Sequence, residues 1–363
     1  MKNLKTIGIV VGVIIAGAVV ALASGAYNPS WNPFGASKSN EDLVIVGFEK
    51  TFDAKSLQVD GSLEIIAKGV KGETGFLDFG DEPKDITLTI DFSNKIDQQD
   101  QQNVKTDTDI TLGLNTEGVD LSAVLKLQTQ KDNFYFMIAS LPAFLPLGDS
   151  LEALQGSWVK ITYPELQNFL AASGVELPSM GQGEMTGLIQ GLNDLVRGKR
   201  LFVAKRKLAQ EKIGETTAQR YVVGFDKDGF KAIIPDYINF VKSLAPQEQI
   251  AEFASQIDKM QEDFLANFEE NWAVLKDFTF DIWTEKGTGK LVKMQWQKEI
   301  QPPQESGLSE SVKTLSFNFV LTFSNFGAKF ETTEPTEYKT LTDVAQLFAL
   351  PAEPATTSDS TLP

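Results

Sequence analysis

The chain has 363 residues and a formal net charge of −16, from 49 Asp and Glu against 33 Lys and Arg. This acidity argues against nucleic-acid binding, because phosphates require a basic surface, and it favours a soluble monomer. The chain contains no His and no Cys, which excludes Ser-His-Asp triads, thiol nucleophiles, disulfides, and imidazole or thiolate metal sites.

The N-terminal segment predicts export of the chain from the cytoplasm. Residues 7–23 form an uncharged apolar run that follows Lys2 and Lys5. A secretory signal would be cut beside small residues such as Ala23. An uncleaved anchor would need about 17–25 apolar residues, and Tyr27 follows where an interfacial aromatic residue would lie. The sequence therefore predicts an extracytoplasmic protein, either anchored to the cytoplasmic membrane through residues 7–23 or secreted after cleavage near Ala23.

Composition divides the remainder of the chain into a linker, a domain and a tail. Residues 24–41 contain Asn-Pro twice together with Gly and Ser, and they predict a linker. Residues 351–363 are rich in Pro, Ala, Thr and Ser, and predict a disordered tail. No stretch of linker composition interrupts residues 42–350, so a single domain is expected there.

Alternation of apolar and polar residues predicts many β-strands in this domain. Successive side chains of a strand point to opposite faces, so alternation indicates a sheet with one apolar and one polar face. Short, turn-like connections such as residues 115–118 indicate antiparallel neighbours. The predicted strands, in chain order, are 57–65, 86–92, 110–114, 121–127, 134–138, 158–161, 201–203, 220–225, 278–282, 292–296 and 315–323.

The last of these strands shows the pattern most clearly. Its alternate residues are large and apolar, and those of the strand near residue 280 are similar. We expect these side chains to line an apolar face, which is either an ordinary filled core or one wall of a cavity that holds an acyl chain. The candidate lining residues from the strands are Leu315, Phe317, Phe319, Leu321, Phe323, Phe278 and Phe280.

A basic cluster in residues 197–207 is the one positive block of this acidic chain. It is interpreted as a solvated strand edge that guards against aggregation. The alternative is a contact with an anionic lipid headgroup or a wall polymer.

A long amphipathic helix is predicted over residues 247–276. Its apolar residues recur at steps of three and four, and at 1.5 Å per residue it would span about 45 Å. It is long enough to lie across a sheet, with Phe264 and Phe268 as candidate cavity residues. One helix stripe packed against one apolar sheet face is an α+β arrangement.

Several longer motifs resemble those of LolA/LppX-like extracytoplasmic lipoproteins, over most of residues 50–345. This resemblance implies a large curved antiparallel sheet, or half-barrel, whose concave face is covered by helices and whose cavity holds lipids or lipoproteins. The chain differs in lacking the lipid-modified N-terminal Cys, and no ligand contact carries over. The motifs are Gly156-Ser157-Trp158-Val159-Lys160-Ile161, Tyr221-Val222-Val223-Gly224-Phe225-Asp226, Phe280-Asp281-Ile282-Trp283-Thr284-Glu285-Lys286, Gly289-Lys290-Leu291-Val292-Lys293-Met294 and Ser324-Asn325-Phe326-Gly327.

The leading hypothesis is a membrane-tethered domain that binds a hydrophobic ligand, either a lipid or the acyl chain of a protein, without catalysis, cofactor or metal. The second hypothesis is a structural or adhesion-type envelope domain with a filled core. A carboxylate hydrolase is the third, since carboxylate pairs formed in space cannot be read from the sequence.

Overall fold

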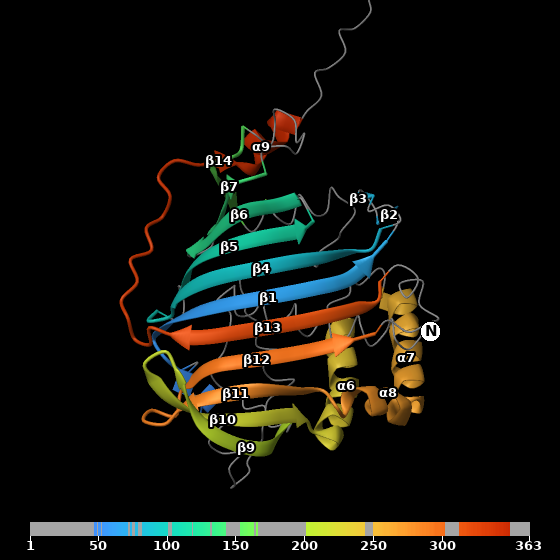
Figure 1. Ribbon diagram of the computed structural model, residues 1–363. Helices are drawn as coiled ribbons and strands as arrows, with labels where there is room; N and C mark the ends of the chain where they lie inside the picture. Colours follow the sequence, from blue (N-terminus) through green and yellow to red (C-terminus); the bar gives the residue numbers. More distant parts are fainter. Residues whose placement is uncertain are drawn as a thin grey trace, which may run out of the picture.

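The strands form one large, open, curved sheet (Figure 1). The computed structural model describes residues 47–48, 50–51, 53–71, 73–74, 77–78, 82–100, 104–117, 119–130, 133–142, 153–162, 165, 201–243, 250–301 and 312–348. The leader at 1–23, the linker at 24–41 and the tail at 351–363 lie outside the described residues. Among the described helices, none has both the length and the apolar character needed to cross a membrane.

Twelve strands follow one another in the order β14-β8-β7-β6-β5-β4-β1-β13-β12-β11-β10-β9. Their pairing is antiparallel except for β14 with β8, which is parallel. The curved antiparallel sheet predicted from the sequence is thus confirmed. The strands are β1 Ser56–Val70, β4 Lys84–Asp97, β5 Lys105–Thr116, β6 Val119–Gln130, β7 Asn133–Ser140, β8 Trp158–Thr162, β9 Phe202–Ile213, β10 Thr216–Phe225, β11 Thr279–Glu285, β12 Leu291–Ile300, β13 Thr314–Ser324 and β14 Lys339–Thr340, with a small separate hairpin of β2 Glu73–Thr74 and β3 Leu77–Asp78.

Strand β1 lies in the middle of the sheet and joins two meanders. It pairs with β4, the first strand of the β4–β8 meander, and with β13, the last strand of the β9–β13 meander. The register places Leu63 opposite both Phe319 of β13 and Ile90 of β4. The alternating apolar residues of β1, β4 and β13 therefore lie on one face of the sheet. A shift of the register by one residue would turn the apolar side chains of one strand to the opposite face.

Gly61 in β1 permits a close contact on this apolar face. Its register partners are Leu321 and Phe92. A Cβ atom built on Gly61 would lie 2.2 Å from the ring of Phe92. The ring therefore occupies the space that any other residue at position 61 would need.

The opposite, polar face is tied together across β9–β12 by a charged cluster. Arg220, Trp283 and Lys293 lie directly opposite one another on three adjacent strands. Arg220 donates hydrogen bonds to Glu211 at 3.0 Å and to Asp281 at 2.9 Å. Its guanidinium and the Lys293 ammonium lie 5.1 and 4.6 Å from the Trp283 ring centroid. The Trp283 indole is buried beneath these cations and donates to Glu211 at 3.0 Å.

Strand β9 forms one edge of the sheet and carries part of the predicted basic cluster. Lys205, Arg206 and Lys207 are exposed, and the pairing of β9 with β10 is interrupted by two register shifts. Charged side chains and bulges are the usual protection of an edge strand, which agrees with the first interpretation of this cluster. Its residues 197–200 lie outside the described part of the chain.

The helices are α6 Lys227–Ser243, α7 Ile250–Ala266, α8 Phe268–Leu275 and α9 Leu341–Phe348. The single helix predicted over 247–276 is wrong in its length, because it divides at Asn267 into α7 and α8. Asn267 has φ −101° and ψ 20°, which is outside the helical region. The helices α6, α7 and α8 lie together beside the ends of β10–β13 (Figure 1).

The chain after β13 runs along one end of the sheet to its far edge, where β14 pairs with β8 (Figure 1). Its first turn uses Asn325 and Gly327, with φ of 52° and 75°. On the polar face, the buried Tyr135 hydroxyl donates to Glu334, and the Lys160 ammonium lies 5.0 Å from the Tyr338 ring centroid. Burial and the neighbouring Glu334 raise the pKa of Tyr135 above its ordinary value. These contacts fix the connection against the sheet.

We expect Gly61→Ala to lower the free energy of unfolding by about 1–3 kcal/mol, because the added methyl group must displace the Phe92 ring. Urea unfolding measures this change. Shortening the ring in a Gly61→Ala/Phe92→Leu double variant should recover part of the loss. Gly287→Ala is the control, since nothing lies within 4 Å of a Cβ atom there; an equal loss in both single variants would contradict the prediction.

The Glu211 carboxylate should stabilise the fold at neutral pH. Its hydrogen bonds from Trp283 and Arg220 lower its pKa below the ordinary value. A carboxyl group whose pKa is lower in the folded chain adds stability above its unfolded pKa, about 4.3, and loses it as pH falls through the folded value. Urea unfolding of Glu211→Gln should therefore show a loss at pH 7 that shrinks below about pH 4. Glu215→Gln, in the exposed β9–β10 turn, should cause no such loss.

Candidate functional site

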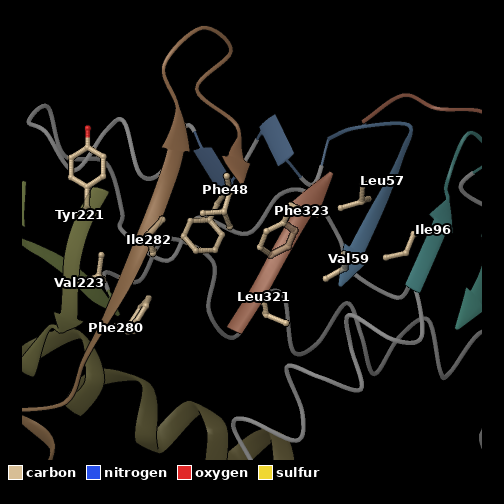
Figure 2. Packing of buried hydrophobic residues seen from close by; sticks show 11 residues of the cluster. Phe48, Leu57, Val59, Ile96, Tyr221, Val223, Phe280, Ile282, Leu321 and Phe323 are labelled. Atoms are coloured by element: carbon tan, nitrogen blue, oxygen red, sulfur yellow. The ribbon is translucent and has the colours of Figure 1, made fainter. Parts of the chain in front are cut away.

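One half of the apolar face is filled with the protein's own side chains. Val59, Leu321 and Phe323 belong to one cluster of buried side chains, and Figure 2 shows them beside Phe48 and Ile282. Leu321 and Phe323 are each 3% exposed. We call this part of the face the closed half. It is defined by Leu57, Val59, Ile96, Tyr221, Val223, Ile282, Leu321 and Phe323.

The other half of the same face is much less covered. Its side chains are only partly buried, although they are as apolar as those of the closed half. Leu88 is 37% exposed and Ile300 40% exposed. We call this part the open half. It is defined by Leu63, Ile65, Leu88, Ile90, Leu112, Leu114, Ile300, Leu315, Phe317 and Phe319.

A stack of aromatic rings crosses the sheet on this face. From β10 to β13, the ring centroids of neighbouring members are 5.2 Å apart for Phe225 and Phe278, 5.0 Å for Phe278 and Trp296, and 5.9 Å for Trp296 and Phe317. The interplanar angles of these pairs are between 26° and 29°. Phe202 extends the stack to β9, 5.3 Å from Phe225. Offset stacking at these distances is favourable for aromatic pairs.

Helical aromatic residues continue this stack beyond the sheet. Phe225 lies 5.4 Å from Phe230 of α6, which in turn lies 6.3 Å from Trp272 of α8. Phe268 stacks on Trp272 at 6.1 Å, and Phe264 lies 6.3 Å from Phe268. The aromatic contacts thus run without a break from α7 to β13.

The predicted site residues fall into two groups. Leu321, Phe323, Phe280 and Phe268 are buried against neighbouring side chains. Leu315, Phe317, Phe319, Phe278 and Phe264 are partly buried. The structure therefore places all seven strand residues on one face and divides them between its two halves, while Phe264 and Phe268 connect to them through the aromatic stack.

Sequence reasoning missed part of this face. Trp296 and Phe225 lie within predicted strands, but their place in the stack depends on β9–β13 lying side by side. Leu63, Ile90 and Leu112 continue the row of Phe319 across β1, β4 and β5 only because β1 is central. Alternation within each strand was the signal that could have identified them. The cavity expected between the sheet and the helices stays a prediction. A depression on α7 is lined by Asp258, Gln261, Glu262, Leu265 and Ala266, none of which is a predicted cavity residue.

The apolar face offers little acid–base chemistry. In β1, β4–β6 and β10–β13, no Asp or Glu points to it, as the strand registers show. Burial raises the pKa of Tyr221, so its phenol is protonated at neutral pH and is a poor base or nucleophile. Within the described residues, no group of three or more Asp or Glu is arranged to hold a metal ion.

Two crystal structures of mycobacterial proteins are similar to this chain. One is LprF from Mycobacterium bovis, with 12% identity and a TM-score of 0.34, covering 83% of this chain and 99% of that chain. The other is the lipoprotein LppX from Mycobacterium tuberculosis, with 11% identity and a TM-score of 0.29, covering 80% and 97%. No family model matches the chain, and no curated protein matches its sequence.

LppX gives its name to the family of lipoproteins that the sequence motifs of this chain resemble. At such identities and TM-scores, a similarity of outline carries no conclusion about what the apolar face binds.

The two halves of the face should respond differently to truncation. We expect Leu321→Ala to lower the free energy of unfolding by about 3 kcal/mol, because it leaves a cavity in the closed half. Leu88→Ala should cost less than about 1 kcal/mol, since that side chain is partly solvated. Urea unfolding of both variants measures the difference. Equal losses would mean that the open half is as well packed as the closed half.

Proposed function

We propose that this domain binds a hydrophobic ligand, a lipid or the acyl chain of an acylated protein, on the open half of its apolar face, without catalysis. The observation that carries the proposal is the continuous apolar surface of Leu63, Ile90 and Leu112, which is only partly buried. Monomeric soluble proteins rarely expose large contiguous apolar patches unless these patches bind something.

The physical basis of binding is the removal of apolar surface from water. Each methylene group that leaves water contributes about 0.8 kcal/mol, so an acyl chain lying over several rows of this face would gain substantial affinity. The aromatic stack supplies a rigid wall at one side of the face, since its rings already contact one another. On β1, β4–β6 and β10–β13, the acidic side chains lie on the polar face and not on the apolar face, which supports a binding role over hydrolysis.

The setting of this binding is also part of the proposal. The apolar run at residues 7–23 supports an extracytoplasmic domain that is tethered to the cytoplasmic membrane, or released from it after cleavage near Ala23. A net charge of −16 supports a monomer that does not adhere to nucleic acid. No cofactor enters the proposed mechanism.

Photocrosslinking of the full chain in detergent tests the proposal. The probe is the methyl ester of a palmitic acid that carries a photoreactive diazirine, and the labelled residues are located by mass spectrometry. We expect saturable labelling of β1, β4, β5 and β13 on their apolar face. Labelling that does not saturate, or that falls equally on both faces of the sheet, would contradict the proposal and favour a structural envelope domain.

A matched pair of variants on β4 sharpens this test. Leu88→Gln places an amide group in the open half and should raise the labelling midpoint of the ester about tenfold, since it removes apolar contact area. Thr87→Gln places the same group on the polar face of the same strand and should leave the midpoint unchanged. Equal midpoints in the two variants would show that the ester does not lie on the open half.

A further inference from the structure

The charges of the sheet are distributed unequally between its faces. In the strands of the open half, the acidic side chains, among them Asp60, Asp91 and Glu299, point to the polar face. The apolar face of β1, β4–β6, β12 and β13 carries two charged side chains, and both are lysines: Lys298 and, at the start of β4, Lys84. This is unexpected in a chain whose acidic residues outnumber its basic residues by 49 to 33.

Lys298 lies at the margin of the open half. It is exposed and stands directly opposite Phe317, between Trp296 and Ile300 on the same face of β12. Its sequence neighbour Glu299 points to the other face, where it accepts a hydrogen bond from Ser316 at 3.1 Å. Among the described residues, no carboxylate therefore forms an ion pair with Lys298.

Lys84 lies at the same ends of the strands as Lys298, but on β4, three strands away from β12. It pairs with Val70 beyond the irregularity in the β1–β4 ladder, and Val70 is buried with Leu315 and Ile86 at the end of the apolar face. In the part of the chain that the structure describes, neither Lys84 nor Lys298 has a hydrogen bond or an ion pair. A lipid whose acyl chain begins beside β12 would thus meet the unpaired Lys298 there, whereas Lys84 lies at the β4 side of the open half.

One row of side chains leads from Lys298 across the open half. Phe317 of β13, Ile65 of β1, Leu88 of β4 and Leu114 of β5 follow it in register, each opposite the next. Figure 1 shows these strands side by side in this order. With neighbouring strands about 4.8 Å apart, the row from β12 to β5 spans about 19 Å, which is close to the extended length of a palmitoyl chain.

We propose that the ligand is an anionic lipid whose acyl chain lies along this row and whose headgroup carboxylate or phosphate binds Lys298 at the β12 side of the row. This inference rests on the proposed function and specifies the chemical class of its ligand. A charge-assisted hydrogen bond at the edge of an apolar surface is stronger than one in water, because its surroundings are partly desolvated.

The experiment compares two probes that differ in one charge. Full-length protein in detergent is titrated at pH 8.5 with the photoreactive palmitate and with its methyl ester, and the labelling midpoints are measured. We expect the palmitate midpoint to be about tenfold lower than that of the ester, which is the effect of one hydrogen bond to a charged group. Lys298→Gln should remove this preference by weakening palmitate alone, whereas Lys298→Arg should keep it.

Lys95→Gln is the matched control, because Lys95 is exposed on the polar face of β4. It should leave both midpoints unchanged. Equal midpoints for the two probes in the unsubstituted protein, or equal effects of Lys298→Gln and Lys95→Gln, would overturn the headgroup site while leaving a neutral lipid as the ligand. If neither probe labels the open half, the proposed function itself fails.

Discussion

The central position of β1 is the constraint on which the rest of this structure depends. This strand, the first of the sheet in sequence, pairs on one side with β4 and on the other with β13, more than 200 residues away, and so joins two separate meanders. Each meander is built from local hairpins, whereas β1–β13 is a long-range contact. Its register decides that Leu63, Phe319 and Ile90 share a face, and thereby creates one apolar surface out of two.

The two faces of the sheet stabilise the protein in different ways. On the polar face, the cluster around Arg220 and Trp283 joins β9–β12 through hydrogen bonds and cation–ring contacts. On the apolar face, burial is concentrated in the closed half, and the partly exposed open half contributes less to stability. A protein that needs a surface for a hydrophobic ligand must leave some apolar area unfilled, and here that area adjoins a well-packed core that can support it.

The charge pattern connects the fold to its proposed ligand. Alternation along the strands sends acidic side chains to the polar face, so the same periodicity that makes the apolar surface also removes negative charge from it. Lys298 is one of two exceptions to this alternation, with Lys84, and it stands at the β12 end of its row. A surface that is apolar along its length and carries a cation at one end is complementary to an anionic lipid, which has an apolar chain and a negatively charged headgroup.

The sequence by itself determined most of the strands, the antiparallel pairing of neighbours and the shared face of residues such as Phe317 and Leu321, because a period of two is a local property that each strand carries alone; it did not indicate β14 or most of β9. It could not determine that Leu321 is buried while Phe317 is only partly buried, since burial depends on what the rest of the chain places over each end of the sheet. It also failed at Asn267, where one helical periodicity continues through a break in the backbone between α7 and α8. The aromatic stack, the row that begins at Lys298 and the division into closed and open halves were decided only by tertiary structure, because they depend on the register between strands that are distant in the chain.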